Sequence, residues 1–106
     1  MFIAMNRFKI IHGYEEDFEN VWRSRDSRLK GVPGFLDFHL LKGHFDETSQ
    51  VTTYASHTLW SSRDAFIEWT QSESFRDAHK NAGDNRHMYM GGPVLETFET
   101  VVDLVN

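Results

Sequence analysis

The sequence contains no cysteine and no apolar run that approaches the length of a membrane span. Without cysteine there is no disulfide framework, no thiolate nucleophile and no thiolate metal site. The first residues also lack the charged-then-apolar pattern of a signal peptide, and a bilayer span needs about 20 apolar residues. We therefore expect no contact with a membrane, and a reducing cytoplasm as the location.

Positive charge is also scarce. The chain has 11 Lys and Arg residues against 16 Asp and Glu residues, for a formal net charge of −5 at pH 7. An acidic balance disfavours the phosphate attraction on which nucleic-acid binding depends, so we expect no nucleic-acid partner. The densest basic cluster, Arg23, Arg25, Arg28 and Lys30, lies within one segment. An anionic small ligand would have to be met by such local side chains.

Large apolar groups are plentiful. Hydrophobic residues make up 40% of the 106 residues, with nine Phe, three Trp and three Tyr among the aromatics. This composition is typical of a folded core and not of a disordered chain. No internal repeat or linker interrupts it, so we expect one domain over residues 1–106.

The order of hydrophobic patterns predicts an α+β fold. We expect strands over 2–11, 35–42, 50–60 and 93–104, a first helix over 14–29, and helical pieces over 61–69 and 71–83 with a break near Gln71–Ser72. Residues 84–93 read as a loop. The order β-α-β-β-α-β is the ferredoxin-like arrangement, which predicts an antiparallel sheet with both helices on one face.

One face of that sheet would be left without a helical cover. Ile3 and Met5 on the first strand would point to this face, together with aliphatic residues of the later strands. Apolar groups on an uncovered face are most simply buried on a second copy of the chain. We therefore expect a homodimer that closes through its sheets, as a two-fold pair.

The first strand raises a question about Asn6. Its side chain shares a face with the apolar residues Phe2, Ala4, Phe8 and Ile10. A buried amide costs about 1–3 kcal/mol if its hydrogen bonds are unmade. Either Asn6 has found partners in a core, or it faces a cavity in which something polar binds.

His79 is the candidate metal ligand. It lies one helical turn after Phe75, and Trp69 and Phe66 precede it on the other helical piece. With no Cys and no HExxH motif it makes a poor zinc site, whereas one imidazole and an apolar pocket suffice as an axial ligand to haem iron. A histidine near a helix C-terminus can equally be structural. Phe66 and Phe75 suit either a core or a haem wall.

Other residues leave two readings open. Arg25, on the apolar stripe of the first expected helix with Phe18, Val21, Trp22 and Leu29, could bond a haem propionate or extend to solvent. Arg86 and His87 could close over a cofactor or be solvated loop residues. His39 and His57 could form a metal pair, but nothing carboxylate-rich stands at ligand spacing beside them.

Three residues together resemble a known family. Asn6 in MNRFKI, Trp69 in AFIEW and His79 in SFRDAHK, with the W-x9-H spacing and the segment PGFLDFHLL, resemble the IsdG-type haem-degrading monooxygenases. These belong to the antibiotic-biosynthesis-monooxygenase-like superfamily. The resemblance covers nearly the whole chain and implies a dimeric α+β barrel.

The resemblance also implies roles for these residues. His79 would be the axial ligand of the haem iron, Trp69 would press on the porphyrin and ruffle it, and Asn6 would hydrogen-bond a ligand on the iron. Haem would be both cofactor and substrate. O₂ and electrons from ascorbate, or from NADPH through a reductase partner, would cleave the ring to a linear tetrapyrrole and release iron.

Two alternatives remain open. A cofactor-independent monooxygenase of the same superfamily, acting on a phenol or quinol, would share the fold and the pocket without needing an iron ligand. A haem carrier without catalytic activity would bind haem and leave it intact. The loop 81–92 does not match the family pattern closely, and the bilin isomer stays open.

Overall fold

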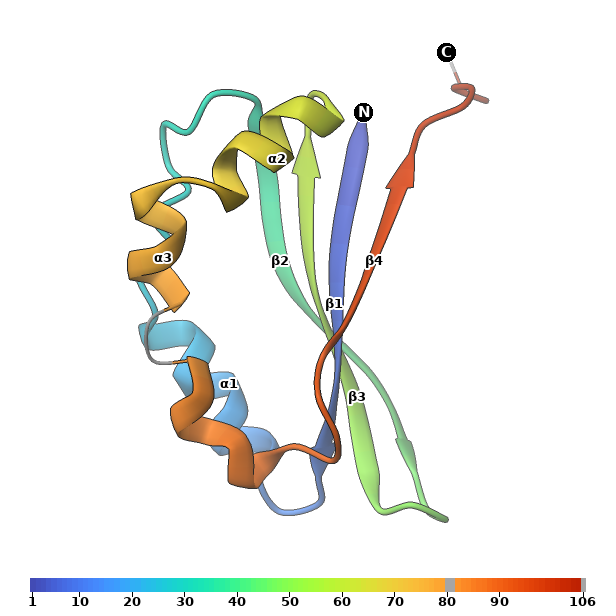
Figure 1. Cartoon of the computed structure of the whole chain (residues 1–106). Helices are drawn as coiled ribbons and strands as arrows, with labels where there is room; N and C mark the ends of the chain where they lie inside the picture. The colour runs from blue at the N-terminus through green and yellow to red at the C-terminus, as the bar shows by residue number, and fades with distance from the viewer. Residues whose placement is uncertain (80–81, 106) are drawn as a thin grey trace.

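The computed structural model describes residues 1–79 and 82–105, without the side chains of residues 82–84. Its elements follow in the order β1 (Phe2–Ile11), α1 (Glu15–Ser24), β2 (Phe35–Asp46), β3 (Val51–Trp60), α2 (Arg63–Thr70), α3 (Glu73–His79), the 3₁₀ helix η1 (Ala82–Met88) and β4 (Val94–Glu99). Figure 1 shows the helical segments on one side of a twisted sheet.

The sheet confirms the predicted ferredoxin-like fold. Its strand order is β2-β3-β1-β4, and all neighbouring strands run antiparallel. The first and last strands of the motif thus lie next to each other, with the β2–β3 hairpin beside β1. Only one face of this sheet carries helices (Figure 1).

The register of β1 and β3 explains the core. The residues of β1 that face the helices are opposite those of β3 that do the same, for example Phe2 opposite Trp60 and Phe8 opposite Tyr54. Two hydrophobic clusters form on this face, one around Trp60 and Trp69 and one around Phe18 and Tyr54. Asn6 lies opposite Ser56 between these clusters, so the row is interrupted by two polar residues at one level of the sheet.

The first helix is shorter than predicted. It ends at Ser24, because Arg25 already has an extended backbone with φ −78° and ψ 134°. Asp26 then accepts a hydrogen bond from the backbone N–H of Arg28 at 3.1 Å, a turn that competes with helix continuation. Arg28 itself has a left-handed backbone, with φ 60°. Leu29 is buried all the same, but it reaches the core from a loop.

Other boundaries also differ from the prediction. Strand β2 continues to Asp46, because its ladder with β3 extends to the pair Asp46–Val51. Strand β4 ends at Glu99, since the N–H of Thr100 bonds the carbonyl of Met1 at 2.8 Å and β1 offers no further partner. The expected loop over 84–93 contains much of η1.

The predicted break in the second helical region is confirmed at Ser72. Its hydroxyl donates to the carbonyl of Trp69 at 2.7 Å and accepts from the N–H of Phe75 at 3.1 Å. One side chain thus ends α2 and begins α3. The helix α3 ends at His79, before the predicted end near Gly83, which belongs to η1; residues 80–81 between them lie outside the described part.

The opposite face of the sheet has no helical cover (Figure 1). Val94, Phe98 and Leu41 on this face have exposed fractions of 57%, 51% and 43%. No helix among residues 1–79 and 82–105 is long and apolar enough to cross a bilayer.

Candidate functional site

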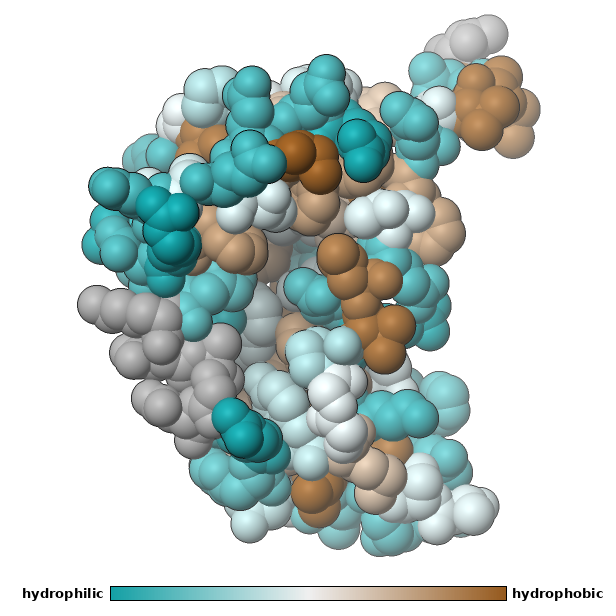
Figure 2. Space-filling view, in the orientation of Figure 1, coloured by the Kyte–Doolittle hydropathy of each residue, from teal (hydrophilic) through white to brown (hydrophobic). Residues whose placement is uncertain are grey.

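Two adjoining cavities lie between the helical layer and the sheet. The larger has a volume of about 530 Å³ and the smaller a volume of about 280 Å³. Both are lined by Asn6, Trp22, Arg25 and His79. We call the two together the cleft. In Figure 2 the surface is hollowed between the helical side and the edge of the sheet. Ligand pockets in proteins are typically about 300–1,000 Å³.

Every residue that the sequence assigned to the site lines the smaller cavity. These residues are Asn6, Arg25, Phe66, Trp69, Phe75 and His79. They come from β1, from the residue after α1, from α2 and from α3. The fold thus brings together side chains that the sequence could only name separately, while their roles remain predictions.

His79 has a defined tautomer. Its Nδ1 atom lies 2.8 Å from the carbonyl oxygen of Phe75. A carbonyl oxygen only accepts, so Nδ1 must carry the hydrogen. The ring also stacks on Phe75, with ring centroids 4.2 Å apart and planes inclined by 29°. In the neutral ring the lone pair is then on Nε2, which is the atom that can ligate a metal.

Trp69 forms a rigid wall of the smaller cavity. Its side chain is 6% exposed and packs edge-on against Phe75, with ring centroids 5.7 Å apart and planes at 88°. Trp60 also packs against it, at 6.4 Å between ring centroids. These two contacts hold the indole in place beside the cavity.

Arg25 is a half-buried cation in the cleft. Its guanidinium carbon lies 4.4 Å from the ring centroid of Trp22, a cation–π contact. Burial lowers the pKa of Arg25, an effect that the nearby Tyr89 opposes. None of the ion pairs found among the described side chains includes Arg25. An anionic group of a ligand in either cavity would meet this cation.

Asn6 answers the question that the first strand raised. Its side chain is partly exposed and lines both cavities. A carboxamide packed in the core would need hydrogen-bond partners. The side-chain hydrogen bonds found in the described part of the chain do not include the amide of Asn6. The amide therefore faces a cavity in which something polar can bind.

Sequence reasoning missed several lining residues. Tyr89, Gly91, Gly92 and Pro93 line the larger cavity next to Arg86. Their segment is held against β1, because the N–H of Met90 bonds the carbonyl of Lys9 at 2.8 Å. No pattern in the sequence pairs this segment with β1. His87 packs edge-on against Tyr14, with ring centroids 5.5 Å apart, and is exposed.

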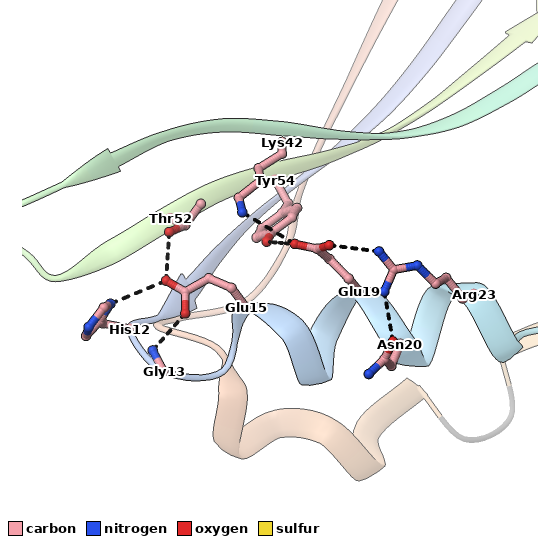
Figure 3. A network of polar contacts seen from close by, with 9 residues as sticks. All are labelled: His12, Gly13, Glu15, Glu19, Asn20, Arg23, Lys42, Thr52 and Tyr54. Carbon is pink, nitrogen blue, oxygen red and sulfur yellow. Dashed lines mark hydrogen bonds and ion pairs between the residues drawn. The ribbon is translucent and has the colours of Figure 1, made fainter.

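A polar network fixes α1 to the sheet below the cleft (Figure 3). Glu15 accepts from the hydroxyl of Thr52 at 3.0 Å, and Glu19 accepts from the hydroxyl of Tyr54 at 2.5 Å. The hydrogen bond from Tyr54 is the main cause that lowers the pKa of Glu19. Burial, followed by this same bond, raises the pKa of Tyr54. The network holds the helix that carries Trp22.

The remaining histidines lie away from the cleft. His39 and His57 have ring centroids 6.4 Å apart on the uncovered sheet face, and His39 Nε2 lies 3.0 Å from Asp37. No group of three metal-ligating side chains occurs in the part of the chain that the structure describes. His12 packs against Phe45 in a tilted arrangement, with ring centroids 5.1 Å apart and planes at 54°.

Comparisons with known proteins identify the family to which this fold and cleft belong. Residues 1–81 match the family described as antibiotic biosynthesis monooxygenase. A staphylobilin-producing heme oxygenase of Staphylococcus epidermidis is 27% identical over 85 residues, which are 78% of this chain and 77% of the relative.

Solved structures share the fold over the whole chain. The heme-degrader MhuD from Mycobacterium tuberculosis, with two hemes bound in its active site, is 25% identical with a TM-score of 0.69, covering 99% of this chain and 100% of that one. SnoaB, a cofactor-independent oxygenase from Streptomyces nogalater, is 23% identical with a TM-score of 0.65, covering 99% and 97%. The chain therefore belongs to the antibiotic biosynthesis monooxygenase family, and is homologous to its heme-degrading members.

Proposed function

We propose that this protein is a haem-degrading monooxygenase, which cleaves the porphyrin ring to a linear tetrapyrrole and releases iron. The observation that carries the proposal is the tautomer of His79, whose Nδ1 is bonded to Phe75 and whose Nε2 is left to act as a ligand. The similarity to a staphylobilin-producing heme oxygenase and to MhuD supports the same activity.

The chemistry of the cleft fits haem. A flat apolar macrocycle needs aromatic walls, which Phe66, Trp69 and Phe75 provide. Its iron needs one imidazole, and its carboxylate substituents need a cation. His79 and Arg25 supply these two groups from the same cavities.

Bound haem would supply the redox centre at which O₂ and external electrons are used. The protein's own residues would bind and orient it. In this proposal His79 ligates the iron, and Arg25 bonds a propionate. Asn6 donates a hydrogen bond to a small ligand, and the indole of Trp69 presses on the ring, which biases the position at which it is cleaved.

We propose three further properties with this activity. The protein would act in the cytoplasm, take electrons from ascorbate or from NADPH through a reductase partner, and form a homodimer through the uncovered sheet face. The exposed apolar side chains of Val94 and Phe98 support the dimer.

A haem titration followed by reduction in air tests the proposal. Wild type and His79→Ala are titrated with haem, then supplied with ascorbate, and the Soret band is followed. We expect the wild-type band to decay to a bilin-like spectrum and the variant to lose this reaction. Persistence of the wild-type band under reductant and O₂ would favour a haem carrier.

A second candidate is a cofactor-independent oxygenase that acts on a phenol or quinol. The similarity in fold to SnoaB favours it, and an apolar cleft with Arg25 would also admit such a substrate. This candidate makes no use of His79 Nε2. Failure of the wild type to bind haem at all, with turnover of a polycyclic quinol in air, would support it.

A further inference from the structure

Ser56 places a hydroxyl group among the nearly buried residues on the helix-covered face of the sheet. It lies on β3 directly opposite Asn6 on β1, and residues opposite each other in antiparallel strands have Cβ atoms about 4.5–5.5 Å apart. Its side chain lines the smaller cavity, and the residue is only 7% exposed. Its neighbours on the same face of β3 are Tyr54, which is buried, and Thr58.

The other hydroxyls of this cavity are already used by the backbone. Thr58 donates to the carbonyl of Ala4 at 3.1 Å, and Thr70 donates to the carbonyl of Ile67 at 2.7 Å. Ser27 accepts from the N–H of Leu29 at 3.4 Å.

Ser56 differs from these residues. The described contacts include no hydrogen bond of its hydroxyl, and its oxygen is not among the buried side-chain atoms that lack a partner, which are the indole nitrogens of Trp22 and Trp60. A hydroxyl of a nearly buried residue that is neither bonded nor sealed off reaches the cavity that it lines. Such a hydroxyl can exchange water for a ligand that enters the cavity, and hydrogen-bond that ligand directly.

The character of the cleft indicates the class of that ligand. No carboxylate occurs among the described residues that line either cavity. The cavity that Ser56 lines also contains the amide of Asn6 and the cation of Arg25, so the site presents hydrogen-bond donors to a ligand. A small electron-rich ligand, such as an oxygen-centred species or a halide, suits this set.

We propose that Ser56 is a further ligand-contacting residue, whose hydroxyl and the carboxamide of Asn6 together hold a small electron-rich ligand in the cleft. The inference rests on the proposed function, since haem iron would be the centre that such a ligand occupies. The hydroxyl of Ser56 adds a second donor opposite the amide of Asn6, and its O–H can rotate toward the ligand.

Fluoride binding to the ferric haem-loaded protein tests this inference without using turnover. Fluoride is a strong hydrogen-bond acceptor, and its affinity is read from the visible spectrum. We expect Ser56→Ala to lower the affinity for fluoride by about 3–10-fold, as loss of one neutral hydrogen bond would. Its affinity for haem should stay within about two-fold of the wild-type value. Ser56→Thr keeps the hydroxyl and should stay close to wild type.

Ser27→Ala is the matched control. It removes a hydroxyl from the same cavity, but one that is used by the N–H of Leu29, so fluoride affinity should not change. Equal fluoride affinity in wild type and Ser56→Ala would overturn the inference while leaving the proposed function intact. Equal weakening in Ser56→Thr and Ser56→Ala would overturn it too, since packing would then be the cause. If wild type binds no haem, the proposed function fails first and the inference falls with it.

Discussion

The imidazole of His79 is bonded through Nδ1 to the carbonyl oxygen of Phe75 at 2.8 Å, one turn earlier in the same short helix. The two rings are also stacked, with centroids 4.2 Å apart. The hydrogen bond fixes the tautomer and the stacking fixes the ring plane. A histidine that is oriented in this way can offer Nε2 to a metal at little entropic cost.

Replacing His79 should remove the iron ligand without unfolding the protein. His79 is exposed, so His79→Ala should change the free energy of unfolding by less than about 1 kcal/mol. Haem affinity should fall by at least about 10-fold, as measured by Soret titration. His44→Ala, on the exposed end of β2, is the control and should bind haem like wild type. Equal haem affinity in His79→Ala and His44→Ala would show that His79 is not the iron ligand.

Arg25 should contribute to haem affinity by binding the negatively charged carboxylates of the ligand. Arg25→Leu should weaken haem by about 10-fold or more, the effect of losing one charge-assisted hydrogen bond. It should have little effect on haem dimethyl ester, which lacks the carboxylates. Spectral titrations with both compounds measure the difference. A loss of the same size for the ester would mean that Arg25 acts through packing on Trp22.

Trp69 should have separable effects on stability and on reaction. The side chain is 6% exposed and packs against Trp60 and Phe75, so Trp69→Ala should cost about 3–5 kcal/mol in urea unfolding. Trp69→Phe keeps most of the packing and should remain folded. We expect this variant to bind haem but to degrade it more slowly or with a changed isomer distribution, read by chromatography. Unchanged rate and products would count against pressure of the indole on the ring.

The bond between Tyr54 and Glu19 predicts a pH dependence of stability. The pKa of Glu19 is lowered from 4.5 in the folded protein, so its contribution is present above pH 4.5 and is lost as pH falls through the lowered folded value. Tyr54→Phe removes the main bond and should cost about 1–2 kcal/mol at pH 7.

The size of that cost should shrink as the pH falls below 4.5 and through the lowered folded pKa of Glu19, because its carboxyl becomes protonated in both proteins. Urea unfolding of wild type and Tyr54→Phe from pH 7 to the lowest pH at which both remain folded measures it. A cost that does not change over this series would show that the charge of Glu19 does not contribute.

The uncovered sheet face predicts the assembly. Phe98 is 51% exposed on this face, opposite Ile3 on β1. Phe98→Glu should convert a dimer to a monomer with little change in the secondary structure, as measured by sedimentation equilibrium and circular dichroism. Arg63→Glu, on the exposed first turn of α2, is the control for added negative charge. A wild-type protein that sediments as a monomer would contradict the dimer.

Alternation and helix-stop signals were sufficient to predict the element order, and therefore the sheet topology. They failed where tertiary contacts decide the backbone. The first helix was expected to include Arg25, but the turn at Asp26 and the left-handed Arg28 end it earlier. Arg25 still reaches the cleft, from a position after the helix that its periodicity does not indicate.

Some residues of the candidate site could be predicted from the sequence, and others could not. Asn6 and His79 could be singled out from the residue types and their pattern, and the family resemblance added Trp69. Ser56 could have been found by pairing the strands, because it lies opposite Asn6 on the same face. Tyr89 and Gly92 could not, since only the folded chain brings their segment back to β1.

Mass spectrometry of the pigment formed in a single turnover shows whether this protein degrades haem. Wild-type protein loaded with one equivalent of haem is reduced with ascorbate in air, and released ferrous iron is captured by a chelator. We expect an iron-free linear tetrapyrrole, in an amount that matches the captured iron, and neither product from His79→Ala. Recovery of intact haem from the wild-type reaction, with no iron captured, would contradict it.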